Sequence, residues 1–399
     1  QRNMICIIII LTLLRQYRID PMSELKKVLI VTYYWPPAGG PAIQRTLKFV
    51  KYMRFFGWEP VILTVENGEY PAIDPSLIQE IPDNIQVYKT KAFQPFQLYR
   101  MLTGKKGNTH NNANVFGQKD KTFVERLAKW IRLNLFIPDA RIGWYAYAVK
   151  AAKKIIEQEH IDLIYSSSPP HSLQLIAQKI AKQNKIKWVA DFRDPWSELV
   201  HYQSYKRTWL TRKIDSHFEK SVFRSADRLV AAANDYATCI KTHVDRKIEV
   251  IYNGYDPSDF PKPKSKNTED FLITYTGELS EDRIPHALLR ALSRLEDSNI
   301  KLQFIGNTCP ELKQEIQQLN LGNKVILKPY MPHIASIAEL QQSDLLLLVI
   351  NQVANGKGIV PGKIFEYLGT RKPILCLGDP TGEAGEIIKT TNSGFCIAH

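Results

Sequence analysis

A loop followed by a helix start is the strongest candidate for binding an anion. In the run GKGIVPGKIFEYLGTRKPIL, which begins at Gly356, Pro361 and Gly362 end a loop and Lys363 begins a helix. The first N–H groups of a helix have no partners within it and carry the positive end of its dipole. Because Lys363 adds a full charge, this stretch suits a diphosphate. A plain surface helix with an exposed lysine has the same local pattern.

A second candidate is the glycine-rich turn in YYWPPAGGPAIQR, where Gly39 and Gly40 lie between the first apolar run and a helix. Such a turn can approach a phosphate or a sugar, although a tight strand-to-helix turn needs glycine in any case. The spacing is not the G-x-G-x-x-G of a nicotinamide or flavin site. This counts against an oxidoreductase.

Two further candidates follow apolar runs. The segment DFRDPW puts Asp191 at the end of a predicted strand, where it is either a site residue or half of an internal Asp–Arg salt bridge. His171 ends SSSPPH after the preceding strand, and it either orients a hydroxyl or relays a proton, or it is a structural histidine beside two prolines.

Composition limits the classes of function. With 399 residues, 44% of them hydrophobic, the chain is long enough for two domains. Its net charge of +13 favours an anionic partner. Because no zinc-finger spacing or nucleic-acid recognition signature accompanies that charge, we expect an acidic lipid surface or a phosphorylated substrate and no nucleic acid. The five scattered cysteines favour a reducing compartment, hence the cytoplasm.

The periodicity of apolar residues predicts an α/β fold. Apolar runs alternate with helix-period segments such as residues 43–56, which is typical of parallel, doubly wound sheets. We expect two tandem Rossmann-like domains facing a central cleft, with ligands beyond the carboxyl ends of the strands. The predicted strands are residues 28–33, 60–65, 163–167, 187–191 and 228–232, followed by 271–276, 301–305, 324–327, 345–350 and 373–377.

Composition also divides the chain. Residues 1–21 contain an apolar run over 4–14, too short for the ~20 residues of a bilayer span, and we interpret them as a non-native or anchor-like extension. We predict an N-terminal domain over 22–255, a linker over 256–270 and a C-terminal domain over 271–399. Within the first domain, residues 105–121 are predicted to be an insertion.

The helix predicted over residues 123–136 has two interpretations. Leu127 and Trp130 lie on its apolar face, and Lys129 and Arg132 are among its polar positions. Both a helix at a membrane surface and an ordinary amphipathic helix on a domain core fit this pattern.

The stretch that begins at Gly356 resembles the family-four-like retaining glycosyltransferases with the glycosyltransferase-B fold. Their signature is an acidic helix start, a small-residue turn and then Pro-Val or Pro-Ile, and Glu366, Pro373 and Ile374 hold the matching positions. The resemblance implies that Glu366 accepts hydrogen bonds from the nucleotide ribose. Two positions depart from the family pattern: Gly358 replaces a glutamate that contacts the donor sugar, and Glu278 replaces a basic residue.

The resemblance extends to the segment YTGELSEDRIPHALLRAL. It implies that Gly277 lets the backbone approach the donor and that Arg283, six positions on, neutralises the leaving diphosphate together with Lys363. It also implies that the first domain binds the acceptor and the second the nucleotide sugar. Related enzymes have a final helix that packs back on the first domain, so we expect this sequence to be truncated at its end.

The expected activity is therefore retaining transfer of a hexose from a nucleotide diphosphate sugar to a glycan or lipid-linked glycan in surface polysaccharide synthesis. We expect no cofactor and no metal, because Arg283 and Lys363 supply the cations and the sequence lacks a D-x-D motif. The expected location is the cytoplasm, with peripheral contact at the inner membrane leaflet. Two alternatives are a sugar-nucleotide epimerase of the same fold and a non-catalytic scaffold with a degenerate nucleotide-sugar site.

Overall fold

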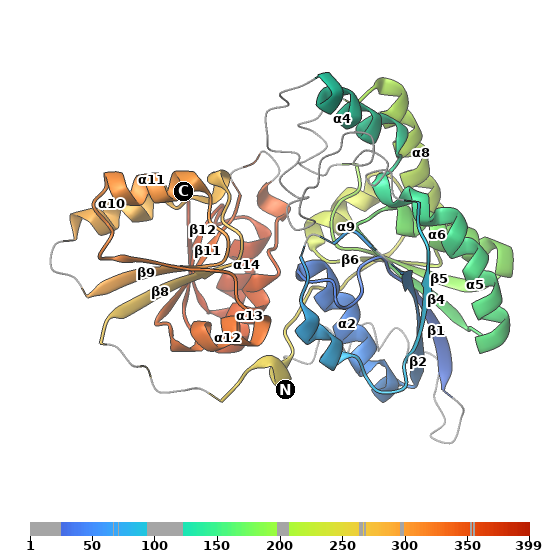
Figure 1. Ribbon diagram of the computed structural model, residues 1–399, viewed down its shortest axis with the longest axis horizontal. Coiled ribbons are helices and arrows are strands. Elements are labelled where there is room, and N and C mark those ends of the chain that lie inside the picture. Colours follow the sequence, from blue (N-terminus) through green and yellow to red (C-terminus); the bar gives the residue numbers. More distant parts are fainter. Residues whose placement is uncertain are drawn as a thin grey trace. The chain divides into compact units, whose positions relative to one another are not determined.

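A computed structural model describes residues 25–66, 68–70, 72–93, 123–197, 207–262, 266, 269–295, 299–351, 353 and 356–399. The chain divides into two compact units, the first ending at Tyr252 and the second beginning at Asn253 (Figure 1). The predicted extension over residues 1–21 and the predicted insertion over 105–121 lie outside the described residues.

Unit 1 is built on a seven-stranded parallel sheet with the order β3-β2-β1-β4-β5-β6-β7. Its inner strands are apolar runs because helices cover both faces of the sheet. The edge strands β3 and β7 are shorter or more exposed, and the apolar pattern did not predict them. The strands are β1 (Lys26–Val31), β2 (Trp58–Val65), β3 (Gln86–Thr90), β4 (Leu163–Ser168), β5 (Lys187–Phe192), β6 (Arg228–Ala231) and β7 (Ile248–Val250).

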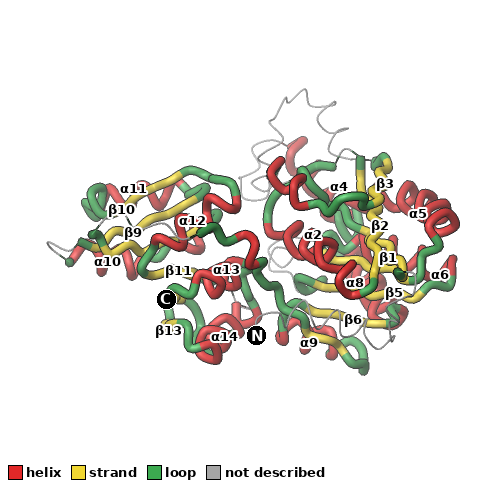
Figure 2. Tube along the Cα trace, turned by 90° about the horizontal axis from the view of Figure 1, so that it is seen from below, coloured by secondary structure: helices red, strands yellow, loops and turns green. Residues whose placement is uncertain are grey.

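Alternate residues of the strands in unit 1 pack into two separate cores. Val28 and Ile30 of β1 pack with helix α2, while Leu29 and Val31 pack with α5, α6 and α8. Figure 2 shows α2 on one side of strands β1 and β2 and α5 and α6 on the other. The helices are α2 (Pro41–Met53), α4 (Phe123–Leu135), α5 (Tyr145–Glu159), α6 (Ser172–Asn184), α8 (Trp209–Ser225) and α9 (Asn234–Lys241).

Unit 2 is built on a six-stranded parallel sheet with the order β10-β9-β8-β11-β12-β13. Helices α10 and α11 cover one face, and α12 and α13 cover the other (Figure 1). The strands are β8 (Phe271–Thr276), β9 (Ile300–Ile305), β10 (Val325–Lys328), β11 (Leu345–Val349), β12 (Ile374–Leu377) and β13 (Gly394–Ile397). The helices are α10 (His286–Arg294), α11 (Pro310–Gln318), α12 (His333–Gln342), α13 (Lys363–Thr370) and α14 (Glu383–Thr391).

The two doubly wound sheets confirm the predicted fold class, and the predicted strands occur within two residues of their expected ends. The segment predicted as a linker over residues 256–270 begins with a 3-10 helix, Pro257–Asp259. Asp256 caps this helix by accepting a hydrogen bond from the Ser258 N–H at 2.9 Å. Because both Asp256 and Asp259 are buried, this part of the segment is packed structure.

Candidate functional site

The ammonium of Lys363 lies at the carboxyl end of strand β8 in unit 2. Its Nζ donates to the carbonyl oxygen of Thr276 at 2.6 Å and lies 4.0 Å from the ring centroid of Tyr275. Burial lowers the pKa of this ammonium. The described residues place no carboxylate within 4.0 Å of Nζ, so a buried cation is left with only a carbonyl and an aromatic face. Such a charge is stabilised when an anion binds beside it.

Gly277 leaves the space that this ammonium occupies. It follows β8 with a φ of +109°, a backbone conformation that other residues rarely adopt. A Cβ atom there would lie 2.9 Å from the Lys363 Nζ. Glycine is therefore needed at position 277 to leave room for Lys363. The predicted close approach of this backbone to a donor stays a prediction.

Arg283 is held by an asparagine that the sequence motifs did not indicate. It ends the 3-10 helix Glu281–Arg283, and its Nε donates to the Oδ1 atom of Asn351 at 2.9 Å. The Nδ2 of Asn351 donates in turn to Asp282. Burial opposes ionisation of Asp282, but hydrogen bonds from Ser280 and Asn351 outweigh it and lower the pKa. Asn351 comes two residues after the last residue of β11, a position that could have identified it as a candidate.

Glu366 lies in the first turn of α13, and its carboxylate is bound by a histidine. The Nε2 of His333 lies 2.9 Å from its Oε1 atom, and the Nδ1 of the same ring lies 3.8 Å from Asp259. Neither His333 nor Asp259 belongs to a motif found in the sequence.

The predicted donor residues of unit 2 come together in space. Arg283 and Glu366 both lie close enough to Lys363 to act on its pKa, the arginine lowering it and the glutamate raising it. Gly362 precedes Lys363 as the N-terminal cap of α13, and Gly277 contacts the lysine from β8. Two cations, the N-terminal turn of α13 and a carboxylate therefore lie together at the carboxyl ends of the central strands.

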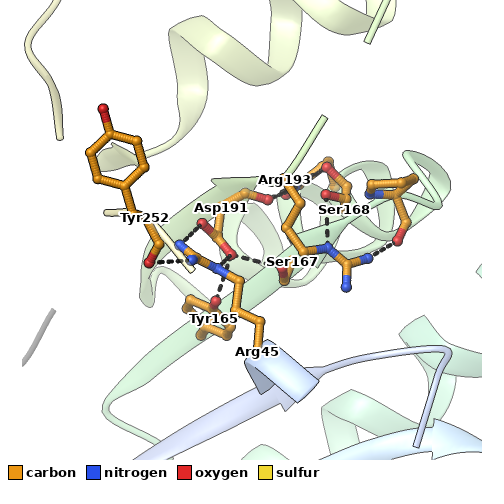
Figure 3. Close-up of polar contacts among 9 residues, drawn as sticks. Arg45, Tyr165, Ser167, Ser168, Asp191, Arg193 and Tyr252 are labelled. Atoms are coloured by element: carbon orange, nitrogen blue, oxygen red, sulfur yellow. Dashed lines mark hydrogen bonds and ion pairs between the residues drawn. The ribbon is translucent and has the colours of Figure 1, made fainter. Parts of the chain in front are cut away.

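Asp191 belongs to unit 1 and is fully buried in an ion pair (Figure 3). Its Oδ1 and Oδ2 accept from the Arg45 guanidinium, both at 2.8 Å, and Oδ2 also accepts from the hydroxyls of Tyr165 and Ser167. Burial alone would raise the pKa of Asp191, but the Arg45 charge outweighs it and lowers the pKa. This placement favours the salt-bridge interpretation over a catalytic one.

The partner in this salt bridge differs from the one that the local sequence suggested. The arginine is Arg45 of α2, and Arg193, two residues after Asp191, instead donates to the carbonyl oxygens of Ser168 and Pro169. Arg45 also donates to the carbonyl of Tyr252 at 3.1 Å, so one guanidinium joins α2, β5 and the last residue of unit 1.

His171, the other catalytic candidate of unit 1, is buried beneath a tryptophan. Its ring stacks on Trp196 with centroids 4.7 Å apart, and neither ring nitrogen has a hydrogen-bond partner among the described residues. Burial, together with the nearby Arg193 charge, lowers the pKa of His171 to about 3. A neutral ring with such a low pKa is a weak base, so the structure favours a packing role over a proton relay.

Gly39 and Gly40 are the remaining predicted donor residues. Local structure alone explains why both positions are glycine. A Cβ atom on Gly39 would come within 3.1 Å of the Asp74 Cβ, and Gly40 caps α2 with a φ of +99°. Contact of this turn with a ligand stays a prediction.

The described residues contain neither a metal-binding cluster nor a helix that could span a bilayer. No group of three or more His, Cys, Asp or Glu side chains in that part of the chain is arranged to hold a metal ion. None of the helices that the structure describes is both long enough and apolar enough to span a bilayer.

Two sequence profiles of glycosyltransferases match this chain. The sequence profile described as Glycosyltransferase Family 4 matches residues 113–259, and the profile described as Glycosyl transferases group 1 matches residues 257–399. Among curated proteins, none matches this chain significantly in sequence.

Several solved structures share the fold. Anabaena HepE in complex with UDP is 15% identical, with a TM-score of 0.59 over 94% of this chain and 86% of that one. The sucrose-phosphate synthase of Thermosynechococcus elongatus is 12% identical, with a TM-score of 0.60 over 94% and 86% of the two chains. A glycosyltransferase from Rickettsia africae ESF-5 is 15% identical, with a TM-score of 0.58 over 94% and 85%.

Proposed function

Because this chain belongs to the family-four-like glycosyltransferases with the glycosyltransferase-B fold, we propose that it is a hexosyltransferase. It moves a sugar from a nucleoside diphosphate sugar to a glycan or lipid-linked glycan in the synthesis of surface polysaccharide. Unit 2 binds the donor. HepE was solved with UDP and with UDP-glucose, which makes uridine the first base to test.

The observation that carries the proposal is the buried ammonium of Lys363, which has no carboxylate within 4.0 Å of its Nζ among the described residues. Its Nζ is held 2.6 Å from the Thr276 carbonyl, at the N-terminal end of helix α13. A diphosphate would place anionic oxygens against both the cation and the positive end of the α13 dipole. Arg283 adds a second cation, so charge that develops on the leaving group is stabilised from two sides.

Titration of nucleoside diphosphates tests this proposal. ADP, GDP, UDP and TDP are titrated against the wild type, Lys363→Met and Glu366→Ala, with affinity measured by calorimetry. We expect one diphosphate to bind, and each variant to weaken it by tenfold or more, about 1.4 kcal/mol. Lys313→Met, on the exposed side of α11, is the matched control and should bind normally. Unchanged affinity in Lys363→Met would overturn the proposal.

The proposed reaction retains the configuration of the sugar and needs neither metal nor cofactor. Arg283 and Lys363 take the role that a divalent cation has in metal-dependent transferases. Activity should therefore persist in EDTA, and the product should show the anomeric configuration of the donor by NMR. If EDTA abolished turnover and added Mn²⁺ restored it, the metal-free account would be contradicted. A reaction without acceptor distinguishes transfer from epimerisation, because an epimerase would still convert the nucleotide sugar to its epimer.

We further propose that the acceptor lies at an anionic membrane surface on the cytoplasmic side. Support comes from α4 and α8, which are joined where Asn134 accepts a hydrogen bond from the Thr208 N–H at 2.7 Å. Leu127 and Trp130 of α4 are 45% and 47% exposed. Trp209, the first residue of α8, is 69% exposed. Exposed apolar and indole side chains of this kind favour the interfacial region of a bilayer.

Three exposed cationic side chains lie near these apolar side chains among the described residues. Arg126 lies on α4, and Arg212 and Lys213 lie on the first turns of α8, where the Lys213 Nζ is 5.9 Å from the Trp209 ring centroid. Co-flotation with vesicles tests the proposal. We expect binding to phosphatidylglycerol vesicles that falls with salt and is lost in Arg212→Glu/Lys213→Glu. Lys150→Glu/Lys153→Glu on α5 is the charge-matched control, and equal loss in both variants would refute this surface.

A further inference from the structure

The carboxylate of Glu366 is bound by a side chain from a different helix. His333 begins α12, Glu366 lies in the first turn of α13, and the His333 Nε2 is 2.9 Å from the Glu366 Oε1. The Glu366 side chain is 27% exposed and that of His333 18%. A glutamate exposed to this extent would otherwise sample several rotamers, and fixing one of them costs conformational entropy. The imidazole therefore restricts a carboxylate that still reaches the surface.

The opposite side of the imidazole faces a second carboxylate. The His333 Nδ1 lies 3.8 Å from the Oδ2 atom of Asp259, which is buried in the 3-10 helix Pro257–Asp259. This distance is beyond a hydrogen bond, so Asp259 acts on the ring through its charge. Because an ionised carboxylate only accepts hydrogen bonds, the 2.9 Å contact requires His333 to present its Nε2–H to Glu366.

One carboxylate oxygen remains for another partner. Each oxygen of an ionised carboxyl group accepts hydrogen bonds, and His333 contacts only Oε1. The Oε2 atom has no hydrogen-bond partner among the described residues. An acceptor held in one orientation beside the proposed diphosphate site can accept hydrogen bonds from a vicinal diol.

We propose that His333 is a positioning residue that orients Glu366 so that its free oxygen accepts the ribose hydroxyls of the nucleotide. This inference rests on the proposed function, because it requires Glu366 to contact a nucleotide ribose. It adds a residue to the site that no motif includes. If His333 only fastened α12 to α13, its loss would reduce stability and weaken every ligand equally.

A ligand that lacks the ribose hydroxyls separates these roles. Affinities for UDP and 2′,3′-dideoxy-UDP are measured by calorimetry in the wild type, His333→Ala, His333→Gln, Glu366→Ala and the double variant His333→Ala/Glu366→Ala. GDP or ADP and their dideoxy forms replace the uridine pair if they bind more tightly. The Gln amide can donate near the position of Nε2, so this variant tests rescue without an imidazole.

We expect His333→Ala to lower the affinity for UDP by about fivefold to tenfold. The affinity for dideoxy-UDP should change by less than about twofold. His333→Gln should restore most of the UDP affinity, and the double variant should bind UDP no more weakly than Glu366→Ala. Urea unfolding of each variant confirms that the folded protein is being titrated.

The outcomes separate the two proposals. Equal weakening of UDP and dideoxy-UDP by His333→Ala, or additive losses in the double variant, would overturn the positioning role while the donor site stands. If Glu366→Ala leaves UDP binding unchanged, Glu366 is not a ribose ligand and the positioning role falls with it. If no nucleoside diphosphate binds the wild type, the proposed function itself is wrong.

Discussion

A Cβ atom on Gly277 would lie 2.9 Å from the Nζ atom of Lys363, so the glycine and the lysine share one small space at the end of β8. The Nζ atom is already fixed by the Thr276 carbonyl at 2.6 Å. Any side chain at position 277 must therefore displace the ammonium from the place where we expect a diphosphate.

The first prediction concerns this contact. Gly277→Ala should destabilise the protein by about 1–3 kcal/mol, because its φ of +109° is strained for alanine. It should also weaken nucleoside diphosphate binding by at least tenfold, because Lys363 is moved. Gly322→Ala is the control, since a Cβ there meets nothing within 4 Å. Urea unfolding and calorimetry measure the two effects, and normal binding by Gly277→Ala would show that Lys363 tolerates displacement.

The donor residues could be predicted from the sequence because their positions follow from local patterns. Gly277 comes directly after an apolar strand and Lys363 directly after a Pro-Gly loop, and the carboxyl ends of parallel strands gather at one edge of a sheet. The partners of these residues could not be predicted. Asn351 is 68 residues from Arg283 and His333 is 33 residues from Glu366, so only tertiary packing brings them together.

Asp191 illustrates the same limit in unit 1. Local sequence suggested a pair with Arg193, but Arg45, 146 residues away, occupies that place. Nothing in a strand-end motif distinguishes a carboxylate that opens to a cleft from one that is covered by a helix from another part of the chain. The edge strands β3 and β7 were missed for a related reason, because solvent on one side removes the apolar pattern that marks inner strands.

The second prediction is that the Arg45–Asp191 pair contributes to stability and not to chemistry. Asp191→Asn should cost about 3–5 kcal/mol, because it leaves the Arg45 charge buried without its counterion. Arg45→Met should cost a similar amount, and the double variant less than the sum of the two. Urea unfolding monitored by tryptophan fluorescence measures these energies.

Activity assays complete the test of Asp191. At a temperature where Asp191→Asn is still folded, its turnover should be close to that of the wild type. A loss of turnover of 1000-fold or more in the folded variant would instead support the predicted catalytic role. Since Arg45 lowers the pKa of Asp191, the stabilisation should persist at all pH values above the ordinary carboxyl pKa of about 4 and decline only in stronger acid.

The third prediction is a pH dependence of stability from His171. Its pKa is about 3 in the folded protein and near 6.5 when unfolded, so the unfolded state binds the extra proton between these values. The contribution of the neutral His171 to the free energy of unfolding should be fully present above pH 6.5 and should fall as the pH decreases toward 3. His171→Phe keeps a ring against Trp196 and should remove this dependence between pH 6.5 and 5. His217→Gln, at an exposed position, is the control, and a slope unchanged in His171→Phe would contradict the assignment.

The fourth prediction concerns Asn351, which holds Arg283 through an Oδ1 contact of 2.9 Å and contacts Asp282 through Nδ2. Asn351→Ala removes both contacts and lets the guanidinium turn toward solvent or toward Asp282. We expect a tenfold rise in the Kd of the nucleoside diphosphate, about 1.4 kcal/mol, with little change in melting temperature. Asn351→Asp should raise the Kd further, because a second acid beside Arg283 competes with the diphosphate for the cation.

The control is Asn323→Ala, which changes an exposed amide in the turn before β10. If Asn351→Ala and Asn351→Asp both bind as tightly as the wild type, Arg283 does not need this anchor and its role at the diphosphate must be reconsidered.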